Sequence, residues 1–434
     1  MRVWHVIVVA LCALVVCSSL SASQLSLDQA VEAALANNKE LQSKRLEIKI
    51  VESERLKARL WSPTNPELEL EAVSDVLTAN SGEGTLRLGL TQEFELGGQR
   101  GHRKKIADAH VALAELELAA SEQALARDVK AAFYSLLLAQ QRLTFAKYVD
   151  SLAVSLRDTA AIRVRNGFLP KSEFTFLDID AASSHNIVNK AEAELTESST
   201  QLLWLMGGLH DSTPETVGEV TYQPLGISED SVVALAIIFR PELKENSSRQ
   251  AATIAELGLA TRERIPNLRV SAFYSRERSV FVADDFIGNT GGIQGLKDAD
   301  HLFGVRFSLP LPLIDKRRSE IAKFHSEVAV IAANNVSLEN QIRYEARNAY
   351  RVLKSSEKSV DVLQNVQPES DSLFQMVQSA YAQGRVTVSD YLTQKERLLN
   401  TRLNLLDAQS SYVTAQRECE RAVGLDWNKI LQGE

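Results

Sequence analysis

The feature that most constrains this chain is an internal duplication of its sequence. Asp28 and Asp230 each stand at the start of a short apolar stretch that reads as a helix, and they lie 202 residues apart. Farther along, Gly167 matches Gly384 at an offset of 217 residues. Offsets shared over such long stretches indicate a repeated structural unit. We therefore expect two copies of one unit, with the extra residues of the second copy in a loop, at 24–215 and 216–434.

Each copy contains two stretches in which apolar and polar residues alternate. Strands are predicted at about 66–73 and 85–95, and at about 267–275 and 301–310. This length and alternation suit a membrane β-barrel, with the apolar face toward lipid and the polar face toward a water-filled lumen. A half-buried sheet of a soluble domain has the same pattern. For a barrel, the candidate lumen-facing residues are Glu67, Glu69, Glu71, Arg87 and Arg306.

Very long helices are predicted after each pair of strands. No proline occurs between Pro66 and Pro170, and the stretch is rich in residues that favour helix. About 68 residues of helix would extend roughly 100 Å. The sequence therefore predicts a mainly α-helical protein with membrane β-structure, each half reading helix, hairpin, long helix, turn and helix. The long helices are expected at about 98–166, 170–206, 315–383 and 388–424.

Four strands cannot close a barrel by themselves. Unpaired strand edges are not tolerated in a bilayer, because lipid offers no hydrogen-bonding partners. Closure must then come from several copies of the chain: two copies give eight strands and three give twelve. Eight strands fill their interior with side chains, whereas a larger barrel leaves a channel.

The N-terminus has the pattern of an export signal. Arg2 precedes a short apolar stretch and then a run of small residues, so residues 1–23 are expected to be a signal peptide. The alternatives are lipidation of Cys17 and a membrane anchor that is retained. The net charge is −8 and no long basic run occurs, which makes a nucleic-acid partner unexpected.

Several segments resemble the TolC family of outer-membrane channel proteins. Tyr381-Ala382-Gln383-Gly384, followed by Ser389-Asp390-Tyr391-Leu392, carries the likeness in the second copy, and Asn166-Gly167 begins the equivalent segment in the first. The stretch from Thr91 to Arg100, which reads TQEFELGGQR, is similar to the CzcC-like heavy-metal-efflux branch. The likeness covers nearly the whole chain after the signal peptide.

The resemblance implies an architecture and a set of partners. It implies a homotrimer in the outer membrane of a Gram-negative bacterium, with a twelve-stranded barrel and a long α-helical periplasmic tunnel. It also implies docking to a periplasmic adaptor (a membrane fusion protein) and to an inner-membrane pump of the resistance–nodulation–division type. The exported substrates would be divalent heavy-metal cations.

The two helix turns are the candidate functional positions. By resemblance, the turns at Asn166, Gly167, Gln383 and Gly384 contact the adaptor. Asp390 matches an acidic residue that rings the tunnel constriction in relatives, and three such carboxylates would attract cations. The alternative is that Asp390 only stabilises the start of a helix.

The sequence predicts no catalytic, cofactor-binding or metal-binding residues. Phosphate-loop, nucleophile-elbow and zinc-protease motifs are missing, and the seven histidines are scattered. The chain is therefore expected to be a passive efflux duct and not an enzyme. A general drug or protein export duct of the same family, or a soluble periplasmic coiled-coil adaptor or scaffold, is the alternative.

Overall fold

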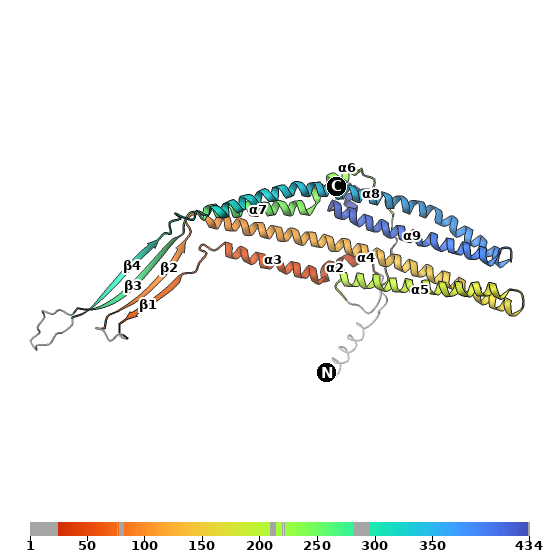
Figure 1. Cartoon of the computed structure of the whole chain (residues 1–434), viewed down its shortest axis with the longest axis horizontal. Helices are drawn as coiled ribbons and strands as arrows, with labels where there is room; N and C mark the ends of the chain where they lie inside the picture. Colours follow the sequence, from red (N-terminus) through yellow and green to blue (C-terminus); the bar gives the residue numbers. More distant parts are fainter. Residues whose placement is uncertain are drawn as a thin grey trace, which may run out of the picture. The chain divides into compact units, whose positions relative to one another are not determined.

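The computed structural model describes residues 25–75, 77, 82–208, 214–218, 220, 222–281 and 296–432. The expected signal peptide, with Cys17, lies outside these residues. As predicted, the fold is mainly helical with one four-stranded antiparallel sheet (Figure 1). Its elements follow in the order α2 (Leu27–Asn37), α3 (Lys39–Ala58), β1 (Glu67–Ser74), β2 (Gly84–Phe94), α4 (Gln99–Arg165), α5 (Lys171–Leu205), α6 (Glu229–Phe239), α7 (Pro241–Arg262), β3 (Leu268–Phe281), β4 (Leu296–Ser308), α8 (Arg318–Ala382), α9 (Val388–Val423) and α10 (Trp427–Gln432).

The chain divides into two compact units. The first comprises the described residues within Met1–Arg45, Leu118–Leu243 and Leu338–Glu434, and the second comprises those within Leu46–Glu117 and Lys244–Ser337. All four strands belong to the second unit, and both helix turns belong to the first. None of the helices in the described ranges is long and apolar enough to cross a membrane.

The sheet has the order β1-β2-β3-β4, so β1 and β4 are its edges. Its register places the alternating residues on two distinct faces. One face carries rows of apolar residues, such as Leu70, Leu88, Tyr274 and Phe303. The other face carries the row Glu69, Gly89, Phe273 and Gly304.

The second hairpin is longer than the sequence indicated. β3 continues to Phe281 and β4 begins at Leu296, beyond the expected 267–275 and 301–310. The expectation that the extra residues of the second copy all lie in a loop is therefore wrong. In the added parts of β3 and β4 the side chains still point alternately to the two faces, but charged residues occur on both faces. The sequence there lacks the alternation of apolar and polar residues that predicts a strand.

The first unit has a core that uses the same positions in both copies. Ala34 of α2 and Ala236 of α6 are fully buried, each in the first helix of its copy. The long helices and the returning helices bury matching residues 217 positions apart. These matching pairs are Val129 and Ala346, Leu136 and Leu353, and Leu202 and Cys419.

The helix ends in the two copies use the same hydrogen bonds. Ser26 caps α2 and Ser228 caps α6, each accepting from the backbone N–H three residues ahead. At the other ends, Asn38 donates from Nδ2 to the Leu205 carbonyl at 3.0 Å, and Arg240 donates from Nη1 to the Ala422 carbonyl at 3.2 Å. Each bond satisfies a carbonyl that a helix C-terminus would leave unpaired.

A glycine follows each of these returning helices at a close backbone contact. Gly207 and Gly424 have φ of 78° and 80°, a left-handed conformation that favours glycine. A Cβ at Gly207 would collide with the Asn37 carbonyl, and one at Gly424 would lie 3.0 Å from the Phe239 carbonyl oxygen. The two glycines therefore let the short first helix of each copy pack against the end of the returning helix.

We expect Gly207→Ala to destabilise the protein more than Gly167→Ala. Gly167 has the same left-handed backbone conformation, but an added Cβ there would have no atom within 4 Å. Gly167→Ala therefore measures the backbone strain alone, which is about 1 kcal/mol. Gly207→Ala adds a steric collision that costs roughly 1–3 kcal/mol more. Thermal unfolding of the purified variants measures the difference. Equal midpoints for the two variants would contradict this packing.

Candidate functional site

The turn between α4 and α5 is closed by a left-handed glycine. Gly167 has φ of 76°, and its N–H donates to the Val164 carbonyl at 3.0 Å. The N–H of Phe168 donates to the Arg163 carbonyl at 2.8 Å. This pair of bonds is the Schellman motif, which satisfies the last carbonyls of a helix. Asn166 adds a bond from Nδ2 to the Ile162 carbonyl at 3.0 Å.

The turn between α8 and α9 repeats this geometry 217 residues later. Gly384 has φ of 69° and donates to the Tyr381 carbonyl at 2.9 Å, while Arg385 donates to the Ala380 carbonyl at 2.9 Å. An added Cβ would meet nothing within 4 Å at Gly167 or Gly384. The glycines are thus required by backbone handedness and not by lack of space. Asn166 and Gln383, the residues before them, are exposed.

The returning helices start differently in the two copies. α5 begins after Pro170, which makes no side-chain cap. α9 begins after Thr387, whose hydroxyl accepts from the Asp390 N–H at 3.2 Å, while Asp390 accepts from the Thr387 N–H at 3.3 Å. This capping box gives Asp390 the helix-starting role that was the alternative in the sequence. Asp390 is also exposed, and its role in a cation gate stays a prediction.

The side chains beneath the turns form an apolar core between the two helix pairs. Leu177 and Val388, the latter at the start of α9, are buried in one cluster with Ala160. Tyr391 is fully buried between Phe374 and Tyr381, with ring centroids 5.7 and 5.1 Å away. Burial, and then the nearby Asp180, raise the pKa of Tyr391, so it stays neutral. Its hydroxyl makes no hydrogen bond with any described group.

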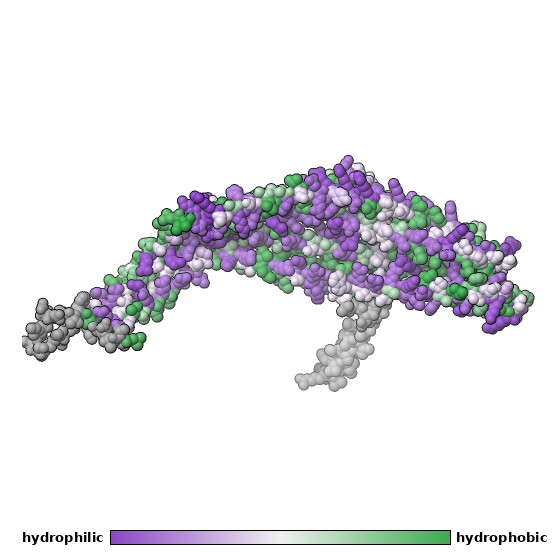
Figure 2. Space-filling view, viewed as in Figure 1, coloured by the Kyte–Doolittle hydropathy of each residue, from purple (hydrophilic) through white to green (hydrophobic). Residues whose placement is uncertain are grey.

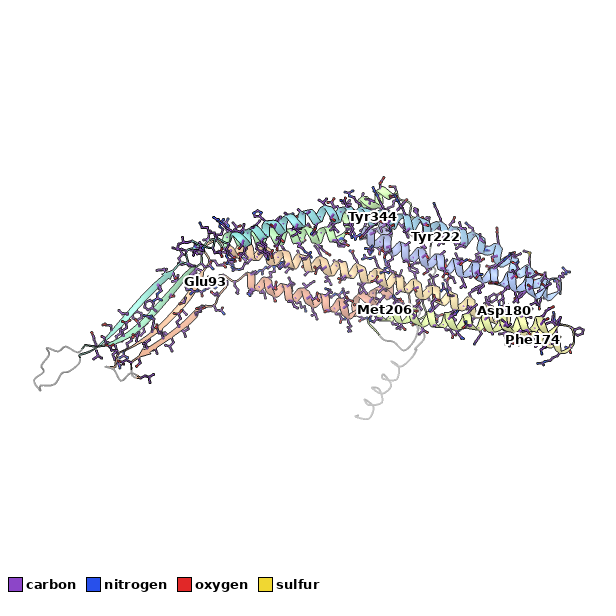
Figure 3. The ribbon with its side chains drawn as sticks, in the orientation of Figure 1. Glu93, Phe174, Asp180, Met206, Tyr222 and Tyr344 are labelled. Carbon is purple, nitrogen blue, oxygen red and sulfur yellow. The ribbon has the colours of Figure 1, made fainter. Side chains whose placement is uncertain are left out.

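A buried ion pair joins α5 to α9 below this core. Lys395 is 4% exposed and donates from Nζ to Asp180 Oδ2 at 2.7 Å and to Ser184 Oγ at 2.8 Å. Figure 3 labels Asp180 on α5, with Phe174 of the same helix closer to the turn. The pair lines a hollow of about 360 Å³ between the two helices, together with Phe176, Leu392 and Glu396.

This ion pair was not predicted from the sequence. Lys395 stands on the buried stripe of α9, between Tyr391 and Leu398. A lysine in such a stripe is a detectable signal, because a lysine is almost never fully buried without a partner. Its partner could not be identified, since Asp180 lies 215 residues away in the sequence.

The structure brings the five candidate lumen residues onto one face of the sheet. Glu67 and Arg306 lie in one cross-strand row, and Glu71 faces Arg87, whose Nη1 lies 3.0 Å from Glu71 Oε2. Glu69 lies in the row between them. On the same face, the Phe273 ring lies 5.3 and 5.5 Å from the Arg87 and Arg306 guanidinium carbons. This arrangement stabilises the two cations over an aromatic ring.

Among the residues that the structure describes, the remaining titratable side chains do not assemble into a metal centre. In the described ranges, no group of three or more His, Cys, Asp or Glu side chains could hold a metal ion. His102 packs against Gly258, whereas His110 lies 4.0 Å from Glu54. Burial, with nearby Glu420, raises the pKa of the Cys419 thiol to about 12, which makes it a poor nucleophile.

Comparison with known proteins identifies the family. Residues 30–208 and 232–425 match the family described as Outer membrane efflux protein. The chain is 23% identical to the cobalt-zinc-cadmium resistance protein CzcC of Cupriavidus metallidurans, over 93% of this chain and 91% of that protein.

Solved structures of outer-membrane channels have the same fold. CusC superposes with a TM-score of 0.71 at 15% identity, covering 93% of each chain. The CmeC outer membrane channel of Campylobacter jejuni gives 0.71 at 15% identity, covering 94% of this chain and 88% of that one. VceC of Vibrio cholerae gives 0.69 at 16% identity, covering 92% and 96%.

This chain therefore belongs to the Outer membrane efflux protein family, the family of TolC-like channels. It is a non-enzymatic efflux channel of the outer membrane, with a membrane barrel and a helical periplasmic portion. Channels of this family form trimers in tripartite efflux systems.

We expect Lys395→Met to destabilise the channel by roughly 2–3 kcal/mol, because it leaves Asp180 beside an apolar core without its counter-ion. The double variant Lys395→Met/Asp180→Leu removes both charges and should recover most of that loss. Thermal stability of the purified channels, compared in a double-mutant cycle, measures the coupling. Additive effects would show that the two side chains do not act as a pair.

Proposed function

We propose that this channel is the outer-membrane duct of a tripartite pump for divalent heavy-metal cations. Its cargo would be cobalt, zinc or cadmium ions, delivered by an inner-membrane pump of the resistance–nodulation–division type through a periplasmic adaptor. The observation that carries the metal assignment is the similarity to CzcC along nearly the whole chain.

The charge on the polar face of the sheet supports a cationic cargo. Seven acidic residues occupy this face, against the three arginines Arg87, Arg269 and Arg306. An excess of carboxylates on a lumen wall concentrates cations and repels anions. The seven acids are Glu67, Glu69, Glu71, Glu93, Glu277, Asp298 and Asp300.

The runner-up is a duct for organic compounds or proteins. Several solved channels of the same fold are equally similar in structure, and a wide duct need not recognise its cargo. Family membership sets aside the third alternative, a soluble periplasmic adaptor.

We expect deletion of this gene to lower the concentration of cobalt, zinc or cadmium that stops growth. A plasmid copy should restore resistance, and sensitivity to organic dyes and detergents should change little. Growth inhibition curves with each metal and with a panel of dyes measure the two responses. Sensitivity confined to organic compounds would contradict the metal assignment and leave the channel assignment standing.

The two helix turns are the proposed docking surface for the adaptor. Both end in the same glycine motif, both expose the residue before the glycine, and Phe168 is 81% exposed at the first turn. An exposed aromatic side chain at a helix turn suits contact with a partner protein.

We expect the double variant Gly167→Glu/Gly384→Glu to lose adaptor cross-linking while the trimer still assembles. Each change adds a charged side chain at the turn and about 1 kcal/mol of backbone strain. Gly98→Glu is the matched control, because Gly98 has φ of 75° and equally open surroundings but lies outside the turns. In-cell cross-linking and outer-membrane trimer levels are the two measurements. Normal cross-linking in the double variant would place docking elsewhere.

A further inference from the structure

The apolar face of the sheet changes character toward the ends of its hairpins. Between the helix ends and the hairpin ends, this face carries rows with exposed apolar side chains, such as Phe303 at 85% and Leu68 at 73% accessible. Figure 2 shows apolar residues at the surface of the strands. Exposed apolar rows of this kind form the lipid-facing band of an outer-membrane barrel. We call these residues the apolar band: Leu68, Leu70, Leu88, Leu90, Phe303, Val305 and Phe307.

Directly beyond the apolar band, the strands β3 and β4 carry a cluster of basic side chains on the same face. Arg276 pairs with His301 in the row that follows Tyr274 and Phe303, and Arg278 occupies the next row of β3. All three side chains are exposed. We call Arg276, Arg278 and His301 the basic cluster.

The strands separate charge strictly between the two faces at this level. The acidic neighbours of the basic cluster in sequence, Glu277 and Asp300, pair with each other on the opposite face. No Asp or Glu occupies a position on the apolar-band face of the described strands. Neither Arg276 nor Arg278 makes an ion pair with a residue that the structure describes. Among the described residues, no acidic side chain therefore occupies either cation.

An aromatic residue joins the basic cluster to the apolar band. The Tyr274 hydroxyl lies 2.6 Å from His301 Nδ1, and the two rings stack with centroids 5.9 Å apart. Tyr274 also contacts Phe303 of the apolar band, at 5.0 Å between ring centroids. Tyrosines with one apolar and one polar side are enriched where a membrane's hydrocarbon ends and its headgroups begin.

Chain connectivity determines which leaflet the basic cluster meets. The helices join the sheet at Glu67, Phe94, Leu268 and Ser308, whereas the basic cluster lies toward the hairpin ends of β3 and β4. Since the helical portion is periplasmic, the hairpin ends face the exterior. The basic cluster thus lies at the level of the outer-leaflet headgroups.

We propose that the basic cluster binds the phosphate groups of phosphorylated glycolipid in the outer leaflet. Arginine pairs with phosphate through two parallel hydrogen bonds, and His301 adds a further polar contact beside it. The apolar band below would receive the acyl chains of the same lipid. The site is therefore expected to bind a lipid that has both phosphate groups and acyl chains, and not free phosphate.

The test uses the purified full-length trimer in detergent and bis-phosphorylated lipid A as the probe. Bound lipid per trimer is counted by native mass spectrometry across a lipid titration. Arg276→Ser/Arg278→Ser should weaken binding roughly 25-fold, at about fivefold for each arginine. Arg269→Ser is the matched control, because Arg269 lies on the same strand but on the opposite face, and its affinity should not change.

Two further measurements use the unaltered protein, so they remain decisive if the double variant does not assemble. Dephosphorylated lipid A should bind the unaltered trimer roughly 25-fold more weakly than the bis-phosphorylated lipid does, and excess inorganic phosphate should not displace bound lipid. Equal binding of the two lipids, equal loss in Arg269→Ser, or displacement by inorganic phosphate would each overturn the proposal.

Discussion

The hydrogen bonds missing at the two edges of the sheet determine how this protein must be built. β1 and β4 each leave a row of backbone N–H and C=O groups without a strand partner among the described residues. In a bilayer each unpaired backbone group costs several kcal/mol. Neither edge strand can therefore remain unpaired in the membrane. The chain must therefore pair its edge strands with those of other copies, and channels of this family form trimers. The need to pair these backbone groups therefore links membrane insertion to assembly of the chains.

The duplication repeats contacts as well as elements. Asn38 and Arg240 differ in chemistry, yet both donate to the carbonyl of a matching residue, Leu205 or Ala422. Gly207 and Gly424 then allow the same backbone approach in both copies. What the two copies share is the satisfaction of helix-end carbonyls, which leaves the side chains that provide it free to differ.

Sequence periodicity predicted the elements whose environment is uniform along their length. The strands β1 and β2 could be predicted because apolar and polar residues alternate along them, and the long helices because their stretches are rich in residues that favour helix. The ends of β3 and β4 could not, because the Arg276 to Ser279 stretch places charge on both faces and lacks an apolar period. The Lys395 and Asp180 pair was also beyond reach, since burial of a lysine depends on a partner that only the folded chain supplies. The position of the helix turns was predictable from their glycines, whereas the capping box of Asp390 needed the geometry of Thr387.

The two helix turns have one backbone shape and two surfaces. Position for position, the exposed Phe168 of the first turn corresponds to the exposed Arg385 of the second. A ring of three chains would present six hairpins of nearly equal geometry in which an aromatic and a cationic side chain alternate. If a ring-shaped partner docked on these turns were rotated by 60°, the backbone shapes in contact would stay the same, but each aromatic side chain would be replaced by a cationic one. Only rotations of 120° would leave the contacts unchanged. In such a ring, the duplication would give the six turns a sixfold backbone arrangement, while their side chains would repeat only threefold.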